Sequence, residues 1–293
     1  MQLVNQFITS KCKPNENVVG LRSKSILFIG DLFQLPPVVN DKDKKLLDDE
    51  YGNPFFFQAH VFKDQPLVYI ELTKIYRQNE QGFINILNRI RQGHLEEDDY
   101  TLLQARYNPS FQDDRNKYIT LTTHNHRADT INRQELQRID SPSFEFTASI
   151  EGDFFENQFP TEKILILKKG AQVMFIRNDS SPEKRFYNGK IAIVHEVNED
   201  EILVEFPESG ILFTVEKETW ENIAYRHNET NNEIEEKVLG RFTQYPLRLA
   251  WAITIHKSQG LTFDYAIIDA GDSFAPGQVY VALSRCTSME GII

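Results

Sequence analysis

One segment of the 293-residue sequence, Gly30-Asp31-Leu-Phe-Gln34, carries side chains suited to phosphate chemistry after a short apolar run. Ligands of parallel α/β sheets bind at loops beyond the carboxyl ends of strands. A carboxylate and an amide placed there can orient a water molecule or contact a phosphate. A turn glycine, a capping aspartate and an exposed glutamine explain the same residues. For this segment alone, that structural explanation is favoured.

Two arginines follow apolar segments in positions that suit an anionic ligand. Arg77 lies between a predicted strand and a predicted helix, where it could complete the transition state of a phosphoryl transfer from another domain. Arg285 lies near the end of a helix predicted to open at Pro276 and Gly277. A structural surface arginine is the commoner reading of Arg77, and a cation that complements the helix dipole explains Arg285 equally well.

The loop His256-Lys257-Ser258-Gln259-Gly260 is the richest in hydrogen-bond donors, and it follows an apolar strand. Such a composition suits the sugar–phosphate backbone of a nucleic acid. A polar surface loop seldom holds so many donors in five residues. Here the functional interpretation is favoured over the structural one.

The elements that must position these residues are those of an α/β protein. Five apolar runs predict strands: Ser25–Ile29, Leu67–Leu72, Tyr118–Thr122, Leu249–Ile255 and Tyr265–Ile268. Helices are predicted from the apolar stripe Phe83–Ile90, which stops near Gly93, over Arg127–Ile139, and after Pro276. Between them, four short strands predict an all-β insertion: Ile164–Leu167, Gln172–Ile176, Ile191–Val197 and Ile202–Phe206.

Four motifs, in order, resemble those of superfamily 1 DNA helicases of the Pif type, which are kin of the RecD-like helicases. They are Gly30-Asp-Leu-Phe-Gln-Leu-Pro-Pro-Val38, Leu72-Thr-Lys-Ile-Tyr-Arg-Gln78, Ala252-Ile-Thr-Ile-His-Lys-Ser-Gln-Gly-Leu-Thr262 and Gly277-Gln-Val-Tyr-Val-Ala-Leu-Ser-Arg285. The resemblance spans nearly the whole chain. It implies an ATP-dependent DNA helicase that moves along single-stranded DNA and opens duplexes, acting in DNA repair, recombination or telomere maintenance.

The resemblance also implies a role for each matching residue. Catalytic roles fall to Asp31, Gln34, Arg77 and Arg285, and nucleotide contacts to Gly30, Gln34, Arg77, Gly260 and Arg285. Gln34 would contact the γ-phosphate or the attacking water, and both arginines would reach the γ-phosphate across a cleft between domains. Contacts to the DNA strand fall to Thr122, His124, Asn125, Thr254, His256, Lys257, Ser258 and Gln259.

The fold that the resemblance implies has two RecA-like parts. Residues 1–72 would be the remainder of the first RecA-like domain. Residues 73–150 and 246–293 would form the second. Residues 151–245 would be an inserted β-rich module, a small SH3-like barrel. The implied cofactors are ATP and Mg²⁺, and the implied partner is single-stranded or forked DNA.

The phosphate-binding loop G-x-x-x-x-G-K-[ST] is absent from the sequence. The only Gly-Lys pair, Gly189-Lys190, has no glycine at the required spacing, and no Asp-Glu pair follows an apolar strand. We therefore expect ATP and Mg²⁺ to be held mainly by residues outside this chain, and we predict no metal site within it. Three explanations stay open: a truncated helicase, which is favoured, half of a split motor, or a degenerate copy.

The overall composition leaves a nucleic-acid partner open. The formal net charge of −11 disfavours one, but the acidic residues gather in separate runs that are expected to be solvated loops and helix ends: Asp48–Glu50, Glu96–Asp99 and Glu229–Glu236. Cys12 and Cys286 match no metal spacing and are expected to be reduced thiols. With no signal peptide and no membrane-spanning run, we expect an intracellular protein: cytoplasmic if bacterial or viral, nuclear or mitochondrial if eukaryotic.

Two functions from different classes are compatible with these features. The favoured one is a portion of an ATP-dependent DNA helicase. The coding sequence upstream of Met1 would distinguish it from the alternative. The alternative is a non-catalytic module, derived from a helicase, that binds nucleic acid or a partner protein. The sequence does not predict an oligomeric state.

Overall fold

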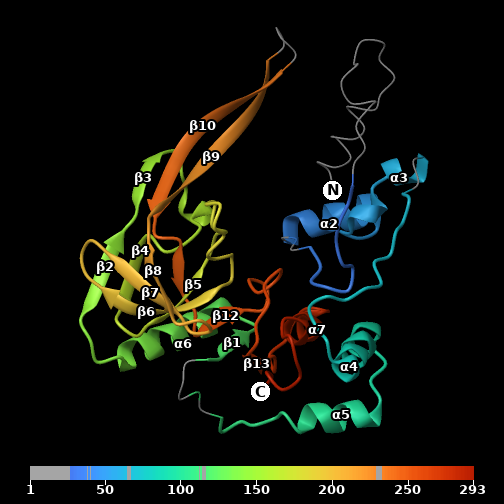
Figure 1. Cartoon of the computed structure of the whole chain (residues 1–293). Coiled ribbons are helices and arrows are strands. Elements are labelled where there is room, and N and C mark those ends of the chain that lie inside the picture. The colour runs from blue at the N-terminus through green and yellow to red at the C-terminus, as the bar shows by residue number, and fades with distance from the viewer. Residues whose placement is uncertain are drawn as a thin grey trace.

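The computed structural model describes residues 27–37, 39, 41–64, 67–111, 113, 117–228 and 233–293. A β-rich part and a helical N-terminal part flank a small α/β layer, which includes β1 (Ile119–Thr122), β12 (Ala252–Thr254) and β13 (Ala266–Asp269) (Figure 1). Helix α7 (Gln278–Ser284) and strand β13 lie near the C-terminus of the chain (Figure 1). The chain is thus α/β with added antiparallel sheets, as the apolar runs predict.

The α/β layer is a parallel three-stranded sheet. Its order is β12 (Ala252–Thr254), β1 (Ile119–Thr122) and β13 (Ala266–Asp269). All three strands end at the same edge, with Thr122 level with Thr254 and Asp269. The helix α6 (Asn125–Arg138) packs against β1 and β12. These elements confirm the strands predicted at Tyr118 and Tyr265 and the helix predicted at Arg127.

The predicted strand Leu249–Ile255 is two shorter strands. Leu247–Leu249 forms β11 and pairs antiparallel with β5, whereas β12 pairs parallel with β1. Residues Ala250 and Trp251 separate them and are both buried. A continuous apolar run therefore serves two sheets, which hydrophobicity alone does not distinguish.

Besides α6, the described residues form five α-helices. α4 (Gln81–Gln92) ends at Gly93, which has a φ of 73°, as its apolar stripe predicts. It buries Phe83, Ile86 and Leu87 and packs against α7 (Gln278–Ser284). α5 spans Glu97–Gln104 and begins with a capping box. The N-terminal part holds α2 (Asp41–Tyr51), α3 (Val61–Asp64) and the 3-10 helix η1 (Phe56–Gln58).

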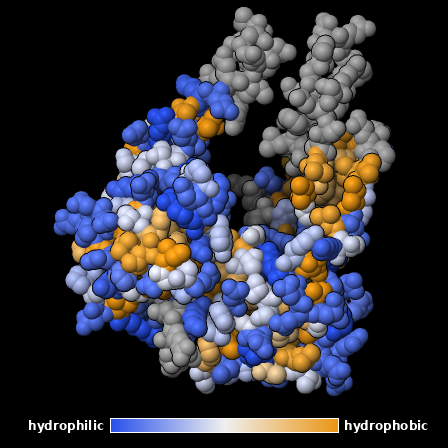
Figure 2. All heavy atoms as spheres, viewed as in Figure 1, coloured by the Kyte–Doolittle hydropathy of each residue, from blue (hydrophilic) through white to orange (hydrophobic). Residues whose placement is uncertain are grey.

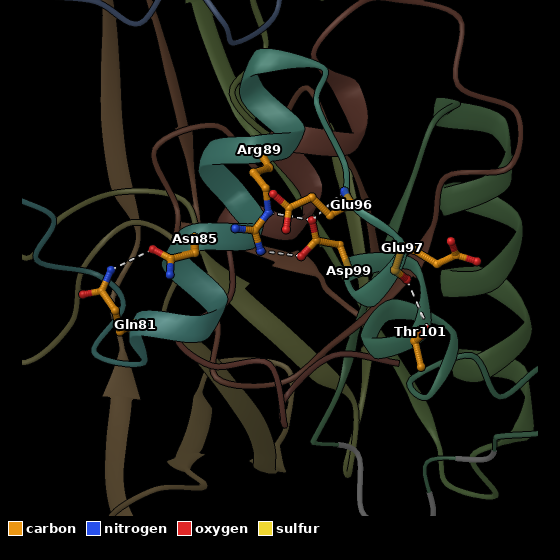
Figure 3. Close-up of polar contacts among 7 residues, drawn as sticks. All are labelled: Gln81, Asn85, Arg89, Glu96, Glu97, Asp99 and Thr101. Carbon is orange, nitrogen blue, oxygen red and sulfur yellow. Dashed lines mark hydrogen bonds and ion pairs between the residues drawn. The ribbon is translucent and has the colours of Figure 1, made fainter.

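A buried ion pair joins α4 to α5 (Figure 3). The Arg89 guanidinium donates from Nε and Nη2 to the two carboxylate oxygens of Asp99, at 2.6 and 2.5 Å. The same carboxylate accepts the backbone N–H of Glu96. The hydrogen bonds from Arg89 hold the pKa of Asp99 below its ordinary value. The acidic run Glu96–Asp99 is therefore a helix start, as expected, but Asp99 is buried and not solvated.

We predict that Asp99→Asn lowers the melting temperature by several degrees at neutral pH, since it leaves Arg89 without its charge partner. The control is Asp98→Asn, because Asp98 is exposed on the same helix turn. Because the folded-state pKa of Asp99 is depressed, this stabilisation is present above the unfolded-state pKa and disappears as the pH falls through the folded-state pKa. Equal melting temperatures for both variants at pH 7 would contradict the prediction.

The β-rich part contains the strands predicted between Ile164 and Phe206. A five-stranded antiparallel sheet has the order β11-β5-β6-β7-β8, and its outer strands do not pair with each other. The strands are β5 (Gln172–Phe175), β6 (Ile191–Val197), β7 (Ile202–Phe206) and β8 (Ile211–Val215). β2 (Ser143–Thr147) pairs with β4 (Ile164–Lys168), β3 (Ser149–Gly152) pairs with β10, and η2 spans Glu156–Gln158. Their inward side chains form one hydrophobic core.

A long antiparallel hairpin projects from this β-rich part (Figure 1). It consists of β9 (Glu218–Asn228) and β10 (Glu233–Gln244), with a bulge between Val238 and Gly240. The expectation that Glu229–Glu236 is a loop or helix end is wrong for residues 233–236, which belong to β10. The rest of that run lies outside the described residues. Cross-strand pairing overrides the low strand propensity of this acidic segment.

Two predicted buried strands are not strands. Residues 67–72 form no ladder, and Val68, Tyr69, Ile70 and Leu72 are each at least 76% exposed. Of Ser25–Ile29, residues 25 and 26 lie outside the described residues, whereas 27–29 are unpaired, with Leu27 80% and Ile29 85% exposed. A strand requires a neighbour for its backbone hydrogen bonds, and no described segment supplies one. Apolar surface gathers over this N-terminal side (Figure 2).

Candidate nucleotide and nucleic-acid site

Arg77 and Arg285 meet at the end of α7. The Arg77 guanidinium donates from Nη1 to the Ser284 carbonyl at 2.9 Å and from Nε to the Thr262 hydroxyl at 2.9 Å. The Arg285 guanidinium donates to the Ser284 hydroxyl at 3.0 Å and to the carbonyls of Val281 and Leu261. The tertiary structure thus brings the two predicted arginines onto one residue.

Neither arginine forms an ion pair within the described part of the chain. Burial, followed by repulsion from Arg77, lowers the pKa of Arg285 to about 10. Burial likewise lowers the pKa of Arg77. Both groups still carry a charge at neutral pH, so a bound anion would relieve repulsion and desolvation together. The pair has the character of an anion site: neither guanidinium is neutralised by an ion pair, although Asp31 lies near enough to raise the pKa of Arg285 slightly against these two effects.

Asp31 and Gln34 lie in a turn opposite this pair. The Asp31 carboxylate accepts the Phe33 backbone N–H at 3.0 Å and the Gln34 amide at 3.2 Å, so Asp31 stabilises the turn but caps no helix. It also accepts the Tyr280 hydroxyl of α7 at 3.4 Å. Gly30 is exposed at the start of this turn. Asp31 therefore has the structural role of holding a turn and also joins that turn to α7, whereas Gln34 is half-buried and not the exposed residue of the structural explanation.

The turn at Gln34 reaches the donor-rich loop. The Gln259 amide donates to the Gln34 side-chain oxygen at 3.4 Å. Gly277 has a φ of 81°, and a Cβ there would lie 2.6 Å from the Phe33 carbonyl oxygen. Only glycine permits this close approach of α7 to the turn. The predicted nucleotide-contacting turn and the predicted DNA-contacting loop are in direct contact.

The donor-rich loop holds its residues in two groups. Thr254 and Ser258 are buried: the Thr254 hydroxyl accepts the Lys257 backbone N–H, and the Ser258 hydroxyl donates to the Ile255 carbonyl at 2.7 Å. These side chains shape the loop. His256 is half-buried, and Lys257, Gln259 and Gly260 are exposed, with Gly260 at a φ of 82°. Partial burial and the nearby Arg248 lower the pKa of Lys257.

Residues at the end of β1 lie beside this loop, because β1 and β12 are parallel neighbours. Thr122 is fully buried, and its hydroxyl has no hydrogen-bond partner among the described residues. His124 is half-buried and accepts or donates a hydrogen bond with Thr123, and Asn125 is exposed at the first turn of α6. Of the predicted DNA contacts, His124, Asn125, His256, Lys257 and Gln259 are therefore accessible.

The residues present fit a phosphate better than a metal ion. Two unpaired arginines suit an anionic oxygen, whereas the described residues contain no cluster of His, Cys, Asp or Glu that could hold a metal. Asp31 is a lone carboxylate engaged by three donors. The described helices also include none that could cross a membrane.

Three residues of the site were not predicted. Gln78 is buried, and its amide donates to the carbonyls of Ser284 and Cys286 at 3.1 and 2.8 Å, which docks Arg77 onto α7. The sequence signal that could have identified Gln78 is its position directly after Arg77. Tyr280 bonds Asp31, and Phe274 stacks on the His256 ring. Only the tertiary structure places these two.

Comparisons with known proteins find DNA helicases. Residues 249–288 match the UvrD-like helicase C-terminal domain family, a range that includes the donor-rich loop and Arg285. The ATP-dependent DNA helicase Pif1 of Campylobacter jejuni is 29% identical over 92% of this chain and 64% of its own. The human ATP-dependent DNA helicase PIF1 is 32% identical over 91% of this chain and 40% of its own.

Solved structures show the same likeness. A crystal structure of Bacteroides Pif1 in complex with ADP-AlF4 is 42% identical, with a TM-score of 0.79 over 90% of this chain and 60% of that one. This chain spans less than two thirds of the length of these relatives. By sequence and by fold, the chain belongs to the Pif1-like superfamily 1 DNA helicases and corresponds to their C-terminal domain region.

Proposed function

We propose that this chain is the portion of an ATP-dependent DNA helicase that senses the nucleotide and grips a single strand. The observation that supports it most is that Arg77 and Arg285 meet at Ser284, with no ion pair to either among the described residues, beside a turn that contacts the donor-rich loop. A module that only bound nucleic acid would gain nothing from two desolvated arginines. The helicase is therefore favoured over the non-catalytic alternative.

In the proposed motor, ATP with Mg²⁺ supplies the phosphoryl group whose transfer to water drives movement, and both are held mainly by residues outside this chain. Arg77 and Arg285 stabilise charge on the transferring group. Gln34 orients the attacking water, and its contact with Gln259 passes the state of the nucleotide site to the strand-binding loop. Closure and reopening of two domains would then move the strand and open a duplex.

The domain organisation is part of the same proposal. Residues 1–72 would complete a first RecA-like domain with a segment beyond this chain, and the exposed apolar segments 27–29 and 67–72 support this. Residues 73–150 and 246–293 would form the second domain, with 151–245 as an SH3-like module. The substrate would be single-stranded or forked DNA. The motor would act in the cytoplasm if it is bacterial or viral, and in the nucleus or mitochondrion if it is eukaryotic.

The test of strand binding is the anisotropy of a labelled, unstructured oligonucleotide titrated with this chain. We expect weak binding whose affinity falls roughly 20-fold between about 50 and 200 mM salt if about three phosphates are neutralised. Lys257→Ala should make the salt slope shallower by about 0.7. Lys44→Ala, an exposed lysine of α2, should leave the slope unchanged. No change of anisotropy at low salt would overturn the proposal.

A further inference from the structure

An exposed phenylalanine lies between two imidazole rings at the strand-binding edge. Phe274, in the connection from β13 to α7, is 63% exposed. Its ring centroid is 5.8 Å from that of His256, at an interplanar angle of 15°, and 5.2 Å from that of His124. His126 extends the set, with its ring 5.4 Å from that of His124. The rings of His124, His256 and Phe274 come from three different connections of the parallel sheet.

The backbone beneath Phe274 is held firmly. The buried Gln278 accepts the backbone N–H of Phe274 at 2.8 Å and that of Ala275 at 3.2 Å through its side-chain oxygen. Arg127 of α6 forms ion pairs with Asp269 at 2.7 Å and with Asp272 at 3.2 Å. The connection is thus tied to two helices. A side chain ordered before a ligand arrives loses little entropy on binding.

Single exposed apolar residues are ordinary on a protein surface. Phe274 is one of these and is not part of the core. Its setting separates it from such residues. His256 opens the donor-rich loop, and Lys257 and Gln259 lie next along the chain with exposed side chains. An apolar ring face therefore stands beside donors suited to phosphates. This juxtaposition matches the two surfaces of a single nucleotide, whose base stacks while its phosphate accepts hydrogen bonds.

We propose that Phe274, supported by His256 and His124, stacks against a nucleobase of the bound strand. The proposal rests on the proposed function and adds a base contact to a loop that otherwise meets only the backbone. Stacking of this kind does not depend on base identity, because every base has an aromatic face. It therefore suits a protein that moves along a strand of any sequence.

The experiment compares two labelled strands at low salt: oligodeoxythymidine and a strand of the same length made of abasic sites. We expect Phe274→Ala to weaken binding of oligodeoxythymidine about tenfold or more and to leave the abasic strand unaffected. Phe274→Tyr should restore most of the loss. Phe155→Ala is the matched control, because Phe155 is 64% exposed on the β-rich part and makes no ring contact with the site.

The outcomes separate this inference from the proposed function. If the unmodified chain binds neither strand, strand binding itself fails. If it binds both strands and Phe274→Ala weakens both equally, or weakens neither, the stacking role is overturned while strand binding stands. A Phe274→Ala variant that binds DNA normally but changes self-association would assign the ring to a protein interface instead. A second readout is the fluorescence of a 2-aminopurine base, which stacking on Phe274 should quench and Phe274→Ala should restore.

Discussion

In a Pif1-type helicase that carries this chain together with a phosphate-binding loop, Arg285→Ala is expected to reduce ATP turnover by about 10³–10⁵-fold. The guanidinium charge is already desolvated beside Arg77, so its stabilisation of the transferring phosphoryl group requires little reorganisation. Arg285→Lys keeps a charge but loses the planar fork and should recover only a small part of the rate. Single-strand affinity should change little, because Lys257 and the accessible loop residues remain.

The control for Arg285 must separate chemistry from stability, because its side chain is 2% exposed and bonds two carbonyls. Arg106 is suited to this purpose. Its guanidinium donates to the carbonyls of Ile292 and Glu290 at 2.8 and 2.6 Å, away from Ser284. Arg106→Ala should lower the melting temperature and leave turnover per folded molecule unchanged. Equal losses of turnover and of strand binding in Arg285→Ala would identify Arg285 as a structural residue.

The second large effect concerns ATP hydrolysis by this chain alone. Purified alone, it should release phosphate from ATP at the background rate, with or without single-stranded DNA. The G-x-x-x-x-G-K-[ST] cradle is absent from the sequence, and the described residues offer no carboxylate cluster for Mg²⁺. Fusing this chain to the phosphate-binding segment of a Pif1 relative should produce DNA-stimulated turnover.

The Arg285→Ala form of the chain alone distinguishes true turnover from contamination. Any residual rate should be the same in both forms and should not respond to an oligonucleotide. DNA-stimulated phosphate release that disappears in Arg285→Ala would contradict the prediction, since it would require a phosphate cradle of another kind within these residues.

Local sequence patterns predicted the elements that are stabilised by residues nearby in the sequence. The apolar stripe from Phe83 and the αL glycine at Gly93 together define α4, because side-chain spacing and a left-handed cap act within a few turns. The strand at Tyr118 and the helix at Arg127 followed in the same way. The two N-terminal strands failed for the complementary reason: apolar residues alone cannot form a strand without a neighbouring backbone. The β9–β10 hairpin was missed because its pairing outweighs its composition.

By itself, the sequence determined the family and the chemistry available to this protein. Four motifs carried the helicase resemblance, and the phosphate-loop pattern that is absent from the sequence is the ground for predicting that the chain alone does not hydrolyse ATP. Only the tertiary structure decided which side chains act together. Arg77 meets Ser284 across 207 positions, Gln34 meets Gln259 across 225, and Phe274 meets the rings of His124 and His256. The physical reason is that parallel strands distant in sequence end at one edge of the sheet, so their connections converge there.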